Sequence, residues 1–87
     1  MAHKNIVGQN LRRKRVELQL SQDQLTTKCN LAGWDLSRGT LAKIEAGLRR
    51  VNDAEVVLLA TVIGMSTNDL LRCDPEELNR IVRQGRE

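Results

Sequence analysis

The stretch Ser37-Arg38-Gly39-Thr40-Leu41-Ala42-Lys43-Ile44-Glu45-Ala46-Gly47 decides the fold that we expect for this chain. Ser37 belongs to the residue types that cap a helix N-terminus, and Gly47 can adopt the left-handed conformation that ends a helix. Leu41 and Ile44 are three positions apart and therefore share one side of a helix. The stretch predicts a short helix with one apolar side.

The other side of this expected helix is polar. Arg38, Thr40 and Lys43 are better suited to contacts with phosphates and base edges than to burial. Arg49 and Arg50 follow directly after the terminal glycine. We interpret the stretch as a recognition helix, the element that reads a DNA groove.

The composition of the chain is consistent with one domain that binds a polyanion. The 87 residues suffice for a core without metal or disulfide, and 40% hydrophobic content is ordinary for a globular chain. Residues 1–50 hold ten Lys and Arg against four Asp and Glu, whereas residues 51–87 hold four against seven. A basic first half facing nucleic acid explains this asymmetry, although solvated basic faces without such a partner are also common.

Several other classes of protein are not supported by the sequence. Cys29 and Cys73 are far apart and His3 is the only histidine, so we expect no metal site and no cofactor. No catalytic set of side chains is recognisable, and we expect no enzyme. No apolar run approaches ~20 residues, which argues against a membrane span, and without a signal peptide we expect a cytoplasmic protein.

Helix signals precede the central stretch. Apolar residues at helical spacing predict a first helix from Asn5 to Gln19. Ser21 and Gln24 form a capping-box pattern that starts a second helix at Ser21, which we expect to run to about Cys29 and to end at a left-handed Asn30. The connector from Asn30 to Leu36 then leads to Ser37. Two short helices joined in this way predict a helix-turn-helix.

Three further helices are predicted after the arginine pair. Asn52-Asp53-Ala54-Glu55 is a second capping box, which opens a core helix that ends at Gly64. Ser66 caps a fifth helix that ends around Arg72. Asp74 and Pro75 start a sixth, which runs to about Gln84 with Gly85 ending it.

The sixth helix carries an apolar stripe of Leu78, Ile81 and Val82. The stripe is explained either by packing on the core beside Leu70 and Leu71 or by self-association in a dimer. The exposed side of the same helix has a basic character and could reach flanking phosphates through Arg80, Arg83 and Arg86.

The run from Val7 to Leu71 resembles the helix-turn-helix domain of Cro and the phage repressors (Xre-type). The matching elements are Val7-Gly8 with Leu11-Arg12, Leu20 to Leu25, Ser37 to Gly47, and Ile63-Gly64-Met65-Ser66 with Asp69-Leu70-Leu71. The resemblance implies an all-α, lambda-repressor-like five-helix domain, here with an extended turn in the helix-turn-helix. We expect residues 1–73 to form this domain and residues 74–87 to add a helix packed on it.

The resemblance also implies roles for individual residues. Gln22 would touch the DNA backbone and brace the recognition helix, the first turns of that helix would read bases, and the loop after it would grip phosphate. The DNA-binding set expected from the capped helix and the resemblance is Gln22, Ser37, Arg38, Gly39, Thr40, Lys43, Arg49 and Arg50. Arg15 and Glu45 correspond to a structural ion pair between the first and third helices.

The function expected from these residues and the resemblance is sequence-specific binding of double-stranded DNA by a bacterial or phage transcriptional regulator. An antitoxin or protein-interaction module built on the same domain is the alternative. The expected partners are an operator, a second copy of the chain on DNA and a protein partner. Trp34, in the long connector, either closes the edge of the core or contacts DNA or a partner.

Overall fold

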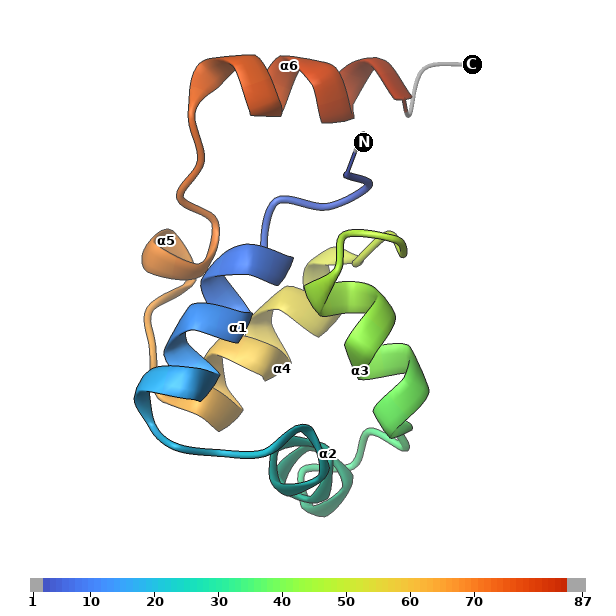
Figure 1. Ribbon diagram of the computed structural model, residues 1–87, viewed down its shortest axis with the longest axis vertical. Coiled ribbons are helices and arrows are strands. Elements are labelled where there is room, and N and C mark those ends of the chain that lie inside the picture. Colours follow the sequence, from blue (N-terminus) through green and yellow to red (C-terminus); the bar gives the residue numbers. More distant parts are fainter. Residues whose placement is uncertain (1–2, 85–87) are drawn as a thin grey trace.

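The chain is all-helical over the residues that its computed structural model describes, 3–84, and this range contains no strand. The helices within it, in chain order, are α1 (Gly8–Glu17), α2 (Gln22–Leu31), α3 (Arg38–Glu45), α4 (Asp53–Ile63), α5 (Thr67–Leu70) and α6 (Pro75–Gln84) (Figure 1). Five helices followed by an additional one confirm the predicted lambda-repressor-like architecture.

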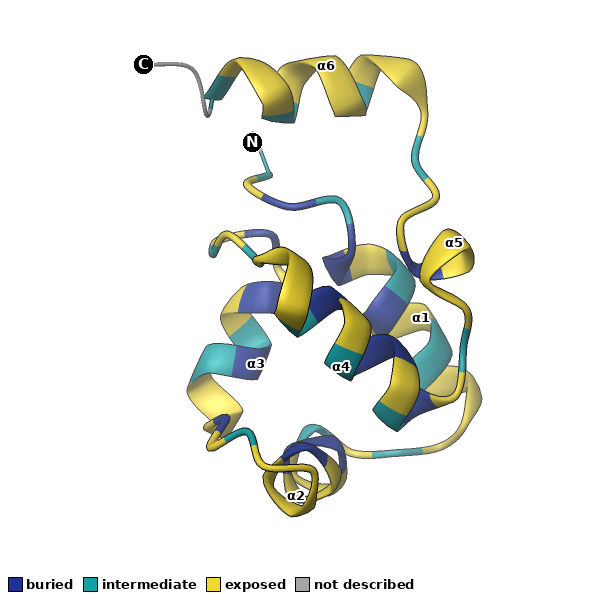
Figure 2. Ribbon diagram, turned by 180° about the vertical axis from the view of Figure 1, so that it is seen from behind, coloured by how far each residue is buried: buried dark blue, intermediate teal, exposed yellow. Residues whose placement is uncertain are grey.

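The first five helices enclose a single apolar core, and each turns its buried side inward (Figure 2). Its largest fully buried side chains are Val7, Leu11, Leu25, Cys29, Leu41, Ile44, Leu59 and Leu70. Trp34 is partly buried and packs against this cluster, as the core-closing interpretation predicted. Burial of these side chains is the main favourable contribution to folding, at about 25 cal/mol per Å² of apolar surface.

Most predicted helix ends are confirmed. Ser21 accepts a hydrogen bond from the amide of Gln24 at 3.0 Å, and the Gln24 side chain accepts from the amide of Ser21 at 2.8 Å, which completes the capping box of α2. Asn52 and Glu55 form the same arrangement at the start of α4. Gly64, with φ of 78°, ends α4 in the left-handed conformation.

Both predicted ends of the first helix and the predicted end of the second are wrong, and α1 ends at Glu17 rather than Gln19. Helix α1 begins at Gly8 rather than Asn5, and the described residues before Gly8 are not helical. The Asn5 side chain instead accepts a hydrogen bond from the Gly8 amide. Helix α2 runs to Leu31, and the left-handed residue beyond it is Gly33 (φ 101°) rather than Asn30. Asn30 lies inside α2, where its amide donates to the Trp34 carbonyl at 2.9 Å and so ties down the connector.

Helix α6 lies across the N-terminal segment rather than flat against the core helices (Figure 1). The Gln84 amide donates to the His3 carbonyl at 2.9 Å. Leu78 is 45% exposed and Val82 is 64% exposed, so the apolar stripe is only partly covered. The expected helix end at Gly85 and the expected contribution of Arg86 lie outside the described residues.

No helix between residues 3 and 84 is long and apolar enough to cross a membrane.

The start of α1 touches the end of α3 at Gly8. A Cβ atom at this position would overlap the Ile44 carbonyl oxygen and would lie 3.1 Å from the Glu45 carbonyl oxygen. Backbone atoms cannot move away as a flexible side chain can. Gly8 therefore sets how closely the two helices approach.

We predict that Gly8→Ala destabilises the fold by about 1–3 kcal/mol, because the helices must separate to admit the methyl group. Gly39→Ala is the matched control, since a Cβ at Gly39 meets no described atom within 4 Å. The control should gain about 0.5–1 kcal/mol from helix propensity alone. Urea unfolding of both variants measures this, and equal stabilities would contradict the close approach.

Candidate nucleic-acid interface

The N-terminus of α3 is capped as the sequence predicted. Ser37 has an extended backbone, and its hydroxyl oxygen accepts from the Thr40 amide at 3.1 Å. The Ser37 and Thr40 hydroxyl oxygens are 3.0 Å apart, which orients the Thr40 side chain. Gly47, with φ of 77°, takes the left-handed conformation just beyond the other end of the helix.

Helix α3 has one buried side and one open side (Figure 2). Leu41, Ile44 and Glu45 are buried. Arg38, Gly39 and Lys43 are exposed, whereas Thr40 is half-buried. The residues expected to read bases therefore lie on one exposed side of a single short helix, except for the partly covered threonine.

Glu45 is an acidic residue in the buried side of α3, and Arg15 of α1 is its partner. The guanidinium Nε donates to Oε2 at 2.7 Å and Nη2 donates to Oε1 at 2.9 Å. The side chains of Arg15 and Glu45 are only 11% and 3% exposed. Hydrogen bonding to Glu45 raises the pKa of Arg15, so the guanidinium keeps its charge.

Two further groups complete this ion pair. Gln22, at the start of α2, donates from its amide to Glu45 Oε1 at 3.1 Å. Arg15 Nη1 donates to the Leu20 carbonyl at 2.8 Å. The pair therefore links α1, α2 and α3, and Gln22 contacts α3 through the side chain of Glu45.

The starts of α2 and α3 meet at one surface hollow. Arg15, Ser21, Gln22, Asp23 and Arg38 line it. Helix N-termini carry a partial positive charge and free amide groups, which favours anions nearby. This edge combines such a terminus with the exposed Arg38 and with the carboxylate of Asp23.

The two arginines after α3 differ in their surroundings. Arg49 forms a bidentate pair with Glu55 of α4, with Nη1 to Oε1 at 2.9 Å and Nη2 to Oε2 at 3.0 Å. These hydrogen bonds raise the pKa of Arg49 and lower that of Glu55. Arg50 is exposed, and no described acidic residue pairs with it. Only Arg50 presents an uncommitted charge.

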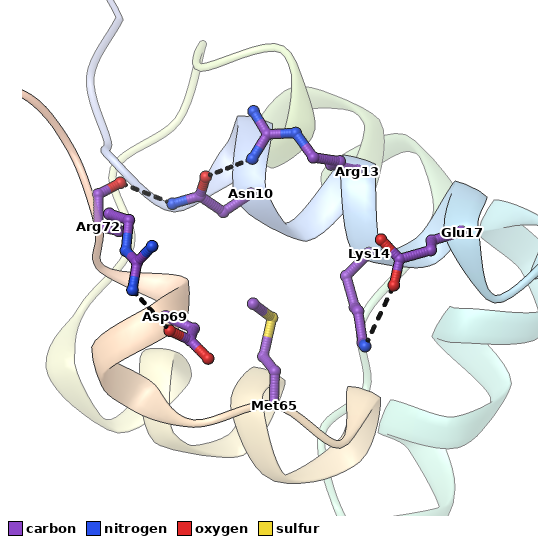
Figure 3. A pocket seen from close by; sticks show the side chains of 7 residues that line it. All are labelled: Asn10, Arg13, Lys14, Glu17, Met65, Asp69 and Arg72. Atoms are coloured by element: carbon purple, nitrogen blue, oxygen red, sulfur yellow. Dashed lines mark hydrogen bonds and ion pairs between the residues drawn. The ribbon is translucent and has the colours of Figure 1, made fainter.

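A polar hollow between α1 and α5 is a separate feature (Figure 3). Its cations are already engaged: Lys14 with Glu17 at 3.4 Å, Arg72 with Asp69 at 3.2 Å, and Arg13 with the Asn10 side chain at 3.2 Å. Figure 1 places α5 on the far side of α1 from α3. This hollow therefore lies away from α3, and its three cations face two carboxylates and one amide side chain.

A metal centre is not part of the described structure. Residues 3–84 contain no cluster of three or more His, Cys, Asp or Glu side chains that could hold an ion. Both cysteines are unpaired; Cys29 is buried and Cys73 is half-buried. Burial raises the pKa of the Cys29 thiol, which keeps it protonated and unreactive.

Asn5 is a structural residue beside α3 that was not expected from the sequence. Asn5 is 7% exposed, and its amide donates to the Ile44 carbonyl at 3.1 Å and to the Arg49 carbonyl at 2.8 Å. It was assigned to a helix because of its position next to an apolar run. No local pattern reveals that its side chain reaches residues about forty positions away, because the contact depends on the tertiary fold.

Comparison with protein families gives one match, to a model described as Helix-turn-helix, which covers residues 11–70. This range extends from the middle of α1 to the end of α5 and contains α2, α3 and their connector. Searches of curated proteins and of solved structures give no significant match.

We predict that Glu45→Ala destabilises the fold by about 3–5 kcal/mol, because it leaves the Arg15 guanidinium buried without its counter-charge. Thermal unfolding followed by circular dichroism measures the loss.

The matched control replaces both partners, Arg15→Met together with Glu45→Leu. This double variant should recover much of the lost stability, because no unpaired charge remains in the interior. Near-native melting of Glu45→Ala alone would mean that the pair is solvated and contributes little.

Proposed function

This chain belongs to the helix-turn-helix family of Cro and the phage repressors, and on that premise we propose that it binds specific sites in double-stranded DNA as a bacterial or phage transcriptional regulator. The family match supports DNA binding itself. Operator recognition and a regulatory role are the proposal.

One observation carries this proposal: α3 is anchored by its buried side and leaves Arg38, Gly39 and Lys43 open on the other. A helix of this kind fits the major groove, which is about 12 Å wide and presents a distinct donor and acceptor pattern for each base pair. Arginine and lysine pair with guanine O6 and N7. Gly39 adds no side chain and lets a base edge or methyl group approach the backbone.

Phosphate contacts would position α3 in the groove. The starts of α2 and α3 would lie against one DNA strand, with Ser37 and Gln22 near the backbone. Arg50, beyond the other end of α3, would meet phosphate on the other side of the groove. Such contacts fix register and contribute affinity without sequence information. The ion pair between Arg49 and Glu55 attaches this loop to α4.

We predict that Lys43→Ala relaxes specificity at one base position. Losing a base contact costs about 1–3 kcal/mol on the preferred site and nothing on a site that already lacks the matching base. The affinity of the variant is compared on a duplex selected by the wild-type chain and on a scrambled duplex. An equal loss of affinity on both duplexes would assign Lys43 to phosphate instead.

The second prediction concerns the salt dependence of binding. Arg50→Ala should weaken binding to all DNA and lower the magnitude of the slope of log K against log salt by roughly one unit, since one phosphate contact is lost. Arg72→Ala is the matched control, an exposed arginine beside α5. Equal slopes for Arg50→Ala and the control would remove the loop from the interface.

We also propose that two copies bind one operator. A single recognition helix covers one half-site, and half-sites about 34 Å apart are read by symmetric dimers. Leu78 and Val82 are four positions apart on α6 and are 45% and 64% exposed, which leaves part of the stripe free for a second copy. The partial exposure of the stripe favours the self-association alternative over simple packing on the core.

Val82→Asp should therefore lower the dimer fraction, because it places a charge in the stripe without disturbing the core. Asn79→Asp, on the same helix and also exposed, is the control for added charge. Sedimentation equilibrium of the full chain measures both variants. A wild-type chain that stays monomeric at high concentration and binds DNA as a single copy would overturn the dimer.

A further inference from the structure

The segment before α1 lies against the end of α3 and the loop that follows it. The Lys4 amide donates to the Gly47 carbonyl at 2.7 Å. The Asn5 side chain donates to the Ile44 carbonyl at 3.1 Å and to the Arg49 carbonyl at 2.8 Å. The segment thus makes hydrogen bonds both to the last turn of α3 and to the loop.

Every polar atom of the Asn5 side chain is used. Its two amide hydrogens go to the carbonyls of Ile44 and Arg49, and its oxygen accepts from the Gly8 amide at 2.7 Å. At 7% exposure, water has little access to this site. Removing the amide would leave the part-buried Arg49 carbonyl without its side-chain donor, which is unfavourable, whereas the Ile44 carbonyl would keep the Gly47 amide at 3.0 Å. One side chain therefore joins α1, α3 and the loop.

The same loop is held from its other side by α4. The Arg49 guanidinium is bound to Glu55, and Glu55 in turn accepts from the Asn52 amide at 3.1 Å. Arg49 is thus fixed at its backbone by Asn5 and at its side chain by Glu55. The next residue, Arg50, is exposed, and its backbone directly follows the residue that these two anchors hold.

We propose that Asn5 is a positioning residue for DNA binding, which acts through Arg50 without touching DNA. This rests on the proposed function, because it takes α3 and Arg50 as the DNA contacts. By linking the last turn of α3 to the loop, Asn5 holds Arg50 at the distance from α3 that a phosphate beside the groove requires. A loop ordered before binding loses less conformational entropy on binding, and the affinity is correspondingly higher.

A double-mutant cycle tests this. The dissociation constants of the wild type, Asn5→Ser, Arg50→Ala and the double variant are measured on the duplex that the wild-type chain selects from a random pool. Serine can still cap the Gly8 amide but supplies neither amide donor. We expect each single variant to bind roughly tenfold more weakly and the double variant to bind no more weakly than Arg50→Ala, because the effect of Asn5 passes through Arg50.

The slope of log K against log salt is a second measurement, and a purely structural role of Asn5 would leave this slope unchanged. Asn5→Ser should lower its magnitude by roughly one unit, as Arg50→Ala does. Asn10→Ala is the matched control, because the Asn10 amide also donates to two backbone carbonyls, those of Leu70 and Arg72, but on the α5 side. It should lower the melting temperature and leave the affinity and the slope unchanged.

The outcomes separate the inference from the proposed function. The inference is overturned if the losses of affinity from Asn5→Ser and Arg50→Ala multiply in the double variant, or if Asn5→Ser keeps the wild-type slope. In either case Asn5 only stabilises the fold, and the proposed interface stands. If Arg50→Ala binds as tightly as the wild type, the proposed interface fails and the inference fails with it. Should Asn5→Ser unfold at the assay temperature, the same cycle is measured below the melting temperature of that variant.

Discussion

The buried ion pair between Arg15 and Glu45 is the interaction on which the rest of this fold depends. A charge inside a small core is tolerated only with a close partner of opposite sign and with its remaining hydrogen-bonding groups satisfied. Here the two side chains are 11% and 3% exposed, and Gln22 and the Leu20 carbonyl complete the set. These groups come from α1, α2, α3 and the loop between α1 and α2. All of their hydrogen bonds form together only when the three helices lie in this arrangement, so the ion pair fixes α3 relative to α1 and α2.

The exposed side of α3 is available because its anchors are all on the buried side or at its ends. Ser37 caps the first turn, Glu45 is held in the last turn, and the close contact of Gly8 sets the distance to α1. Asn5 extends this support to the loop that carries Arg50. In the part of the chain that the structure describes, the side chains of Arg38 and Lys43 form no hydrogen bond or ion pair that anchors α3. Both side chains are therefore available to a ligand.

How far the sequence predicts this structure depends on how local each interaction is. The capping boxes at Ser21 and Asn52 involve residues three positions apart, and both were predicted correctly. The Arg15 and Glu45 partnership came from family resemblance, since thirty positions separate the two. The hydrogen bonds of Asn5 and the pairing of Arg49 with Glu55 could not be predicted, because they depend on how the loop packs. The residues expected at the interface from Ser37 to Lys43 lie together on α3, while their contacts with DNA stay a prediction.

Amide chemical-shift mapping measures whether the outer side of α3 and the loop after it contact DNA. Titration of the isotope-labelled chain with a duplex that it selects should shift the amides of residues 37–43, of Arg50 and of Gln22. The amide signals of Asp69, within α5, and of Arg72, just after it, should not shift. The largest shifts falling on α5 and α6, with those of residues 37–43 unchanged, would contradict the account.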